Sequence, residues 1–117
     1  MRLVIADNDA AVLDLLTLDM KLEGHEIVGT AMDGAAAVDA CTTLAPDVLI
    51  VDLRLGRGPD GIDVAGLVRR PDLRVILHTN YISKETISRA RTVGALVVEK
   101  GSLRTLRRAV RGEEQPD

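Results

Sequence analysis

Short runs of apolar residues alternate with longer segments in which apolar residues recur every three or four positions. The short runs cover residues 3–6, 26–31, 48–51, 74–79 and 95–98, and their lengths predict β-strands. The longer segments cover residues 10–22, 35–44, 61–70, 84–93 and 103–111, and glycine or proline follows each of the first four closely. Helical spacing with such stop signals predicts helices. The chain therefore repeats a strand–helix unit five times.

A strand–helix repeat of this kind predicts an α/β protein with a (βα)₅, doubly wound, five-stranded parallel sheet covered by helices on both faces. The nearly continuous apolar strands agree with burial on both sides of the sheet. Right-handed connections place the carboxyl ends of all the strands at one edge. Ligands of such sheets bind at that edge, where the strand order switches.

Composition narrows the class of protein. The chain has 117 residues, which suits one domain, and its 46% apolar and 28% charged residues are typical of a globular protein. Tyr81 is the single aromatic residue, so the core is expected to be aliphatic. The net charge of −3 gives no reason to expect direct binding of nucleic acid or of an anionic membrane.

Targeting signals and cysteines bear on the compartment. Cys41 is the single cysteine, which excludes an intrachain disulfide and a cysteine metal site. Asp7 and Asp9 interrupt the N-terminal apolar run, and no other run approaches the length of a membrane span. We expect a cytoplasmic protein without a membrane partner.

Polar residues collect where the predicted strands end. The residues at these positions are Asp7, Asn8, Asp9, Asp33, Asp52, Thr79 and Lys100. Crowded carboxylates repel one another unless a divalent cation bridges them, and oxygen ligands favour Mg²⁺. A magnesium ion beside a lysine and a hydroxyl group suits a phosphoryl group, with a carboxylate as nucleophile. No GxxxxGK[ST] loop is present, which argues against a nucleotide cradle.

These residues, on a layout of five strand–helix units, resemble the receiver domain of bacterial two-component response regulators. The stretch DLRLGRGPDG also resembles the loop that follows the phosphoacceptor in that family. The resemblance covers residues 1–112 and leaves 113–117 as a polar C-terminal tail. It implies the flavodoxin-like receiver fold.

The resemblance implies a role for each residue at this edge. Asp52 would accept a phosphoryl group from a sensor histidine kinase or a phosphotransfer protein, and Lys100 would contact the phosphoryl oxygens. Thr79 would move toward the phosphoryl group and pass the change to the surface formed by the fourth helix, fifth strand and last helix. Such a domain is a signalling module whose own chemistry is limited to its phosphorylation and dephosphorylation.

The implied cofactor is Mg²⁺. The ligands that the resemblance implies are Asp7, Asn8, Asp9, Asp52 and the backbone carbonyl of Arg54. Asn8 stands where the family usually has a second acid, so either magnesium binds more weakly or Asp9 compensates. Asp9 is also suited to cap the first helix, and both roles stay open.

Other positions depart from the family pattern. Val97 occupies the position of an aromatic switch residue, and Gly101 follows the lysine where proline is common. Arg54 and Tyr81 resemble the family's variable positions that tune dephosphorylation. Thr79, Tyr81, Val97 and Arg54 are therefore the candidate switch or tuning residues.

Two other functions stay open. A haloacid-dehalogenase-type phosphatase would use Asp7 as nucleophile and Asp9 as acid and base, with Thr79 and Lys100 beside them, but it would leave Asp52 without a role. A degenerate receiver would bind its partner without phosphorylation, as Asn8, Val97 and Gly101 suggest.

The output partner is not specified by these residues. No helix-turn-helix segment is present, so the chain is either a stand-alone receiver or a piece of a longer regulator, with a DNA-binding domain or a second copy as possible output. The last helix has four arginines on one side, at positions 104, 107, 108 and 111. They form either a solvated face or a basic docking face for an acidic partner or a second copy.

Overall fold

The computed structural model describes residues 1–113, in which five strands and five helices alternate. The elements are β1 (Arg2–Ala6), α1 (Ala10–Leu22), β2 (Glu26–Ala31), α2 (Gly34–Leu44), β3 (Val48–Val51), α3 (Gly61–Leu67), β4 (Arg74–Thr79), α4 (Lys84–Thr92), β5 (Leu96–Glu99) and α5 (Leu103–Val110). The predicted fold class is confirmed. No helix in residues 1–113 combines the length and the apolar character needed to cross a membrane.

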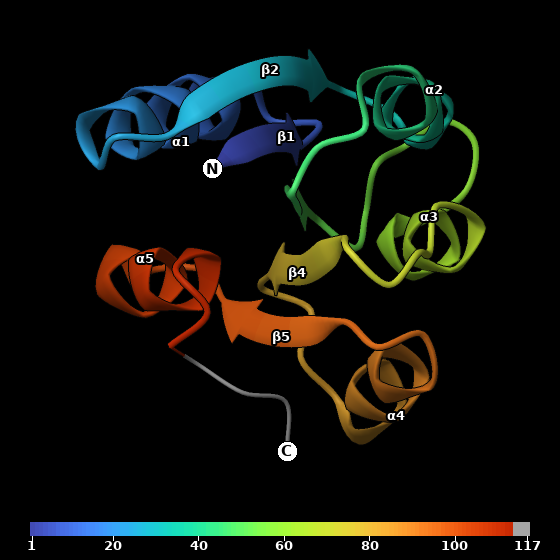
Figure 1. Cartoon of the computed structure of the whole chain (residues 1–117). Helices are drawn as coiled ribbons and strands as arrows, with labels where there is room; N and C mark the ends of the chain where they lie inside the picture. Colours follow the sequence, from blue (N-terminus) through green and yellow to red (C-terminus); the bar gives the residue numbers. More distant parts are fainter. Residues whose placement is uncertain (114–117) are drawn as a thin grey trace.

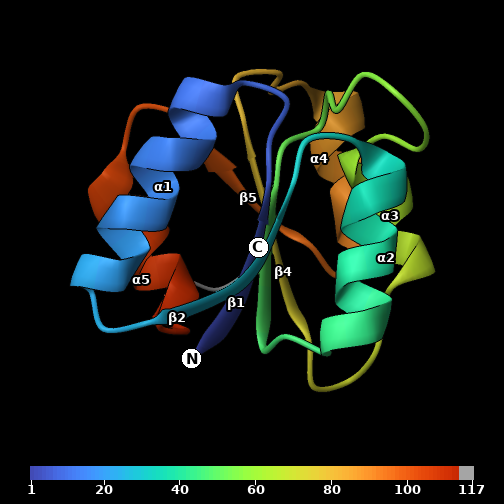
Figure 2. The same cartoon turned by 90° about the horizontal axis from the view of Figure 1, so that it is seen from above.

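The strands form one parallel sheet in the order β2-β1-β3-β4-β5. Helices α1 and α5 cover one face, and α2, α3 and α4 cover the other (Figures 1 and 2). The chain moves from β1 to β2 on one side and then returns to place β3 on the other side of β1. The order therefore switches between β1 and β3, which is where such sheets bind ligands.

Alternation along the strands divides the core into two aliphatic layers. Leu3 and Ile5 of β1 pack in the layer beneath α1 and α5. Val4 and Ala6 belong to the layer beneath α2, α3 and α4. Successive side chains of a strand point to opposite faces, so both faces of this sheet are apolar, as a doubly wound sheet requires.

An aspartate or a serine caps the start of every helix in the described residues. The caps are Asp9, Asp33, Asp60, Ser83 and Ser102, and each side chain accepts a hydrogen bond from a backbone N–H of the first turn. Such a bond satisfies a donor that has no partner inside the helix. Several of the acids at the carboxyl edge of the sheet are therefore engaged by helix ends.

One predicted boundary was wrong by several residues. Helix α3 ends at Leu67, whereas the sequence predicted a helix to residue 70. Pro71 disfavours helical geometry at the residue before it, and the guanidinium of Arg70 turns away to the carbonyl of Pro46 and the carboxylate of Asp72. The other boundaries lie within one residue of the prediction.

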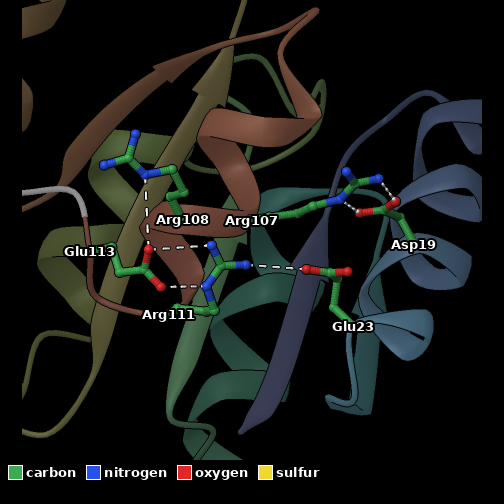
Figure 3. Close-up of polar contacts among 6 residues, drawn as sticks. All are labelled: Asp19, Glu23, Arg107, Arg108, Arg111 and Glu113. Carbon is green, nitrogen blue, oxygen red and sulfur yellow. Dashed lines mark hydrogen bonds and ion pairs between the residues drawn. The ribbon is translucent and has the colours of Figure 1, made fainter.

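Ion pairs join α5 to α1 (Figure 3). Arg107 donates two hydrogen bonds to Asp19, and Arg111 pairs with Glu23 and with Glu113. Arg108 also lies near Glu113, at 3.9 Å. Much of the charge of the predicted arginine face is therefore matched inside the domain. Of the predicted tail 113–117, residues 114–117 lie outside the described residues.

Candidate functional site

Two acids flank the point where the strand order switches. Asp7 directly follows β1 and Asp52 directly follows β3. The backbone N–H of Asp52 donates to the carbonyl of Ala6 at 3.0 Å, which continues the β1–β3 ladder to the acids themselves. Asp7 and Asp52 therefore lie side by side at this edge of the sheet, as the sequence predicted.

Lys100 joins these two acids. Its Nζ lies 2.8 Å from Oδ2 of Asp7 and 2.8 Å from Oδ2 of Asp52. The two acids are only 1% and 4% exposed, and buried charges need such pairing. Burial works against the ammonium form, but the hydrogen bonds that Lys100 donates to Asp52 and Asp7 outweigh it and raise the pKa of Lys100 above its ordinary value.

The two carboxylate oxygens of Asp52 differ in their surroundings. Its Oδ1 is buried and has no hydrogen-bond partner among the described residues, while Oδ2 accepts from Lys100. A buried carboxylate oxygen without a donor is costly. This oxygen is therefore the atom at the site that is chemically suited to a cation or to a new covalent bond.

Thr79 ends β4 beside the acids and is fully buried. Its carbonyl accepts a hydrogen bond from the backbone N–H of Lys100 at 3.0 Å, so the two predicted residues are fixed to each other. Its Oγ1 accepts from the backbone N–H of Tyr81 at 3.1 Å. Val97 lies half-buried in β5 and packs against the core layer beneath α2, α3 and α4.

The predicted metal ligands differ in their surroundings. Oδ1 of Asp9 caps α1 by accepting from Ala11 and Val12, and its backbone N–H donates to Asp7 at 2.8 Å. Asn8 is exposed. Within residues 1–113, no three carboxylate, imidazole or thiolate groups gather closely enough to hold a metal ion by themselves. A magnesium ion would depend on amide, backbone and water oxygens as well.

A groove of about 550 Å³ opens beside Asn8. It is lined by Arg54 and most of the other residues of the β3–α3 loop and, from α4, by Arg89, which pairs with Asp60 at 3.1 Å. Arg54 stacks over the ring of Tyr81, with its guanidinium carbon 3.9 Å from the ring centre. The two candidate tuning residues therefore contact each other, a contact that the sequence did not predict.

Two glycines that sequence reasoning did not single out fix the β3–α3 loop. The N–H of Gly61 donates to the carbonyl of Leu53 at 2.8 Å, and a Cβ on Gly61 would overlap the carbonyl oxygen of Asp52. A Cβ on Gly34 would likewise overlap the carbonyl oxygen of Pro59. The sequence signal for these close approaches was a glycine directly after an N-cap aspartate in both places, and such a pair is only weak evidence.

His78 lies beside the candidate site. It directly precedes Thr79. In the β3–β4 register Val51 pairs with Leu77, so the next residues, Asp52 and His78, lie beside each other. The ring is 4% exposed, and neither nitrogen has a hydrogen-bond partner among the described residues. Burial and the charge of Lys100 lower the pKa of His78, and the neighbouring acids oppose this more weakly.

The lowered pKa of His78 predicts a loss of stability in mild acid. The unfolded chain binds a proton at this residue as the pH falls below 6.5, and the folded chain does so only at lower pH. The free energy of unfolding should therefore fall between about pH 7 and pH 5, by at most about 1.4 kcal/mol per pH unit for one proton. Urea unfolding at several pH values measures this slope.

The control separates His78 from the other histidine. His78→Leu should flatten the slope, because it removes the group that titrates. His25→Gln should retain most of it, because burial lowers the pKa of His25 as well but this residue, beside the amino group of Met1, is less buried than His78. An equal slope in the wild type and in His78→Leu would contradict the assignment.

Comparison with known proteins agrees with this geometry. The family model for the response regulator receiver domain matches residues 3–111. The transcriptional regulatory protein PdtaR of Mycobacterium tuberculosis is 33% identical over 96 residues, which are 81% of this chain and 46% of that protein. The DNA-binding response regulator MtrA of Mycobacterium leprae is 36% identical over 70 residues, which are 58% of this chain and 29% of MtrA.

Solved structures show the same fold. The signal receiver domain of the response regulator NarL from Mycobacterium tuberculosis superposes with a TM-score of 0.87 at 32% identity, covering 95% of this chain and 93% of that one. A CheY-like receiver from Methanospirillum hungatei gives a TM-score of 0.88 at 22% identity, covering 96% and 91%. The chain belongs to the response regulator receiver family, and it spans less than half the length of the curated relatives PdtaR and MtrA.

Proposed function

We propose that this receiver domain accepts a phosphoryl group on Oδ1 of Asp52. The observation that carries the proposal is that this oxygen is buried and has no hydrogen-bond partner within residues 1–113, while Oδ2 accepts from Lys100. In the transfer, the P–N bond of a phosphohistidine breaks and a P–O bond to Asp52 forms. The lysine ammonium, 2.8 Å from Asp52, supports the charge on the phosphoryl oxygens.

The donors at the site fit Mg²⁺. Asp7 and Asp52 supply carboxylate oxygens, and Asn8 and the backbone carbonyl of Arg54 supply neutral ones, which is the hard oxygen set that this ion prefers. A bound ion would supply positive charge beside the phosphoryl oxygens. The carboxylate of Asp9 caps α1, so it would act through a water molecule or through its own backbone N–H to Asp7 rather than as a direct ligand.

The donor proposed is a sensor histidine kinase or a phosphotransfer protein, in agreement with membership of the receiver family. The switch would begin at Thr79, whose hydroxyl holds the backbone of Tyr81 at the start of the β4–α4 loop. If the Thr79 hydroxyl donated a hydrogen bond to the phosphoryl group instead, the bond from the Tyr81 N–H would be lost. The β4–α4 loop would then be released, which would alter the face formed by α4, β5 and α5. Val97 has no aromatic ring to couple to this step, so the movement of Tyr81 would transmit most of the change.

The experiment is intact mass measurement after incubation with Mg²⁺ and acetyl phosphate. The wild type should gain one phosphoryl group, and Asp52→Asn should gain none. Asp33→Asn is the matched control, because Asp33 lies at the same edge of the sheet but only caps α2. An adduct of equal yield in Asp52→Asn would overturn the proposal.

Other outcomes separate the alternatives. Loss of the adduct in Asp7→Asn alone, with turnover of a phosphate ester by the wild type, would indicate the haloacid-dehalogenase-type phosphatase. The family assignment favours the receiver over that enzyme. A folded wild type that gains no phosphoryl group would indicate a degenerate receiver that binds its partner unphosphorylated.

The stacked pair of Arg54 and Tyr81 should slow hydrolysis of the phosphorylated site. The pair lies at the β3–α3 and β4–α4 loops that border Asp52 and Thr79, so it limits the approach of water. We expect Tyr81→Ala to shorten the lifetime of phosphoryl-Asp52 by roughly 3- to 10-fold, the size of a contact of about 1 kcal/mol. Arg57→Ala is the control, because Arg57 lies in the β3–α3 loop with Arg54 but is not part of the stacked pair. Loss of the adduct followed by mass spectrometry gives both rates.

The output stays a proposal. PdtaR is named as a transcriptional regulator and MtrA as a DNA-binding response regulator, and this chain matches only part of each. We propose that phosphorylation acts through a DNA-binding domain or through self-association, without direct nucleic-acid binding by this domain. A cytoplasmic location stays a prediction.

A further inference from the structure

Helix α1 carries an apolar ridge on its outer side. Leu15, Leu18 and Leu22 are 51%, 58% and 77% exposed, although Leu13 and Leu16 of the same helix are buried. By helical geometry the ridge points almost directly away from the sheet. Nothing in the described residues covers it, and three large exposed side chains in line indicate a contact surface rather than scattered surface residues.

The spacing of the ridge matches a coiled-coil seam. Ala11, Leu15, Leu18 and Leu22 are separated by four, three and four residues, which is the repeat of the a and d positions of a heptad. A seam of this kind fits another helix with the same spacing. The helix α1 of a second copy has that spacing by construction.

The charges beside the ridge identify the second copy as the better occupant. On the side facing α5, Asp19 and Glu23 are engaged by Arg107 and Arg111 (Figure 3). On the opposite side, the exposed side chains of Asp14 and Lys21 make no hydrogen bond or ion pair in residues 1–113. One acid and one base therefore flank the seam, seven residues apart.

These two charges complement themselves in an antiparallel pair. When two copies of α1 run in opposite directions, Leu15 packs beside Leu18 of the second copy. The same register places Asp14 next to Lys21 of that copy, and two-fold symmetry repeats the pair. A parallel pair would place Asp14 on the side of Asp19 of the second copy, an acid that Arg107 already engages.

We propose that α1 is an interface through which two copies of this chain associate, antiparallel and with two-fold symmetry. The helix has 13 residues and is therefore about 20 Å long, so the contact falls below the area of a stable dimer. We expect a reversible dimer with a dissociation constant of roughly 100 µM. The proposal does not rest on phosphorylation of Asp52.

Sedimentation equilibrium of the chain between about 10 µM and 1 mM tests the interface. The wild type should associate, and Lys21→Asp or Asp14→Lys alone should weaken association by roughly 10-fold, because like charges then meet at both ends of the seam. The double variant Asp14→Lys with Lys21→Asp restores the complementary pairs. It should associate within about 3-fold of the wild type.

Two further variants locate the contact. Leu18→Ser removes the centre of the seam and should abolish association. Leu67→Ser removes a similarly exposed leucine from α3, on the opposite face of the sheet, and should change nothing. A wild type that is monomeric at 1 mM, equal association in Lys21→Asp, or a double variant that stays monomeric would each overturn the proposal.

Discussion

Gly61→Ala is expected to lower the free energy of unfolding by about 2–4 kcal/mol, as expected for a forced backbone shift in a packed site. The added Cβ would overlap the carbonyl oxygen of Asp52 and press on Leu53. Both are backbone contacts that no side-chain rotation relieves. The start of α3 must move away from the strand end, which breaks the bond from the Gly61 N–H to the Leu53 carbonyl. Urea unfolding measures the loss. Far-UV circular dichroism is the suitable probe, because the chain has no tryptophan whose fluorescence could be followed.

The matched control is Gly66→Ala in the same helix. A Cβ at Gly66 meets only the side chain of Val93, at 3.4 Å. The helix should gain up to about 1 kcal/mol there, because alanine is a better helix former than glycine. Equal stability of Gly61→Ala and the wild type would show that the close contact between Gly61 and the backbone of Asp52 does not hold the loop in place.

The fold was predictable because its signals are local. Each strand is a short aliphatic run, and each helix begins after a capping residue such as Asp9 or Ser83 and ends near a glycine or proline. The strand–helix alternation then leaves little choice but a parallel sheet. The end of α3 was missed because a tertiary contact, from Arg70 to the carbonyl of Pro46, competes with the helix.

The centre of the site was predictable for a related reason. Asp7, Asp52 and Lys100 each follow a strand, and a parallel sheet collects such residues at one edge. The sequence could not decide between the two roles of Asp9, because capping and metal binding use the same carboxylate. In the structure its Oδ1 accepts from the first turn of α1.

Contacts between distant loops were not predictable. The stack of Arg54 on Tyr81 and the approach of Gly61 to Asp52 depend on how the β3–α3 loop folds over the sheet edge. Nothing local to either residue encodes these distances. The position of His78 beside Asp52 was not predictable either, since it depends on the register of β3 and β4.

Lys100→Met is expected to affect both stability and phosphorylation. Lys100 is the cation that joins Asp7 and Asp52, two acids almost without solvent exposure. Removing one partner of a buried ion network leaves uncompensated charge, which costs about 3–5 kcal/mol when the site is dry. The lysine side chain is 16% exposed, so water reaches the site, and we expect a loss of about 2–4 kcal/mol.

The same variant should respond to Mg²⁺ more strongly than the wild type. Two carboxylates without their ammonium repel each other, and a divalent ion that binds between them relieves the repulsion only in the folded chain. Millimolar Mg²⁺ should therefore restore part of the lost stability. Lys84→Met, at an exposed lysine in the first turn of α4, should match the wild type with and without the ion.

Phosphorylation by acetyl phosphate should slow by about 100-fold in Lys100→Met, the usual effect of removing one charge-stabilising donor from a transfer site. The two readouts separate two roles of the lysine. A variant as stable as the wild type but slow to phosphorylate would mean that Lys100 acts only on the transferring group. Loss of stability without slower phosphorylation would contradict its proposed contact with the phosphoryl oxygens. We expect loss of stability and slower phosphorylation together. Lys100 holds Oδ2 of Asp52 in the resting domain, and the same hydrogen bond leaves Oδ1 as the reactive atom.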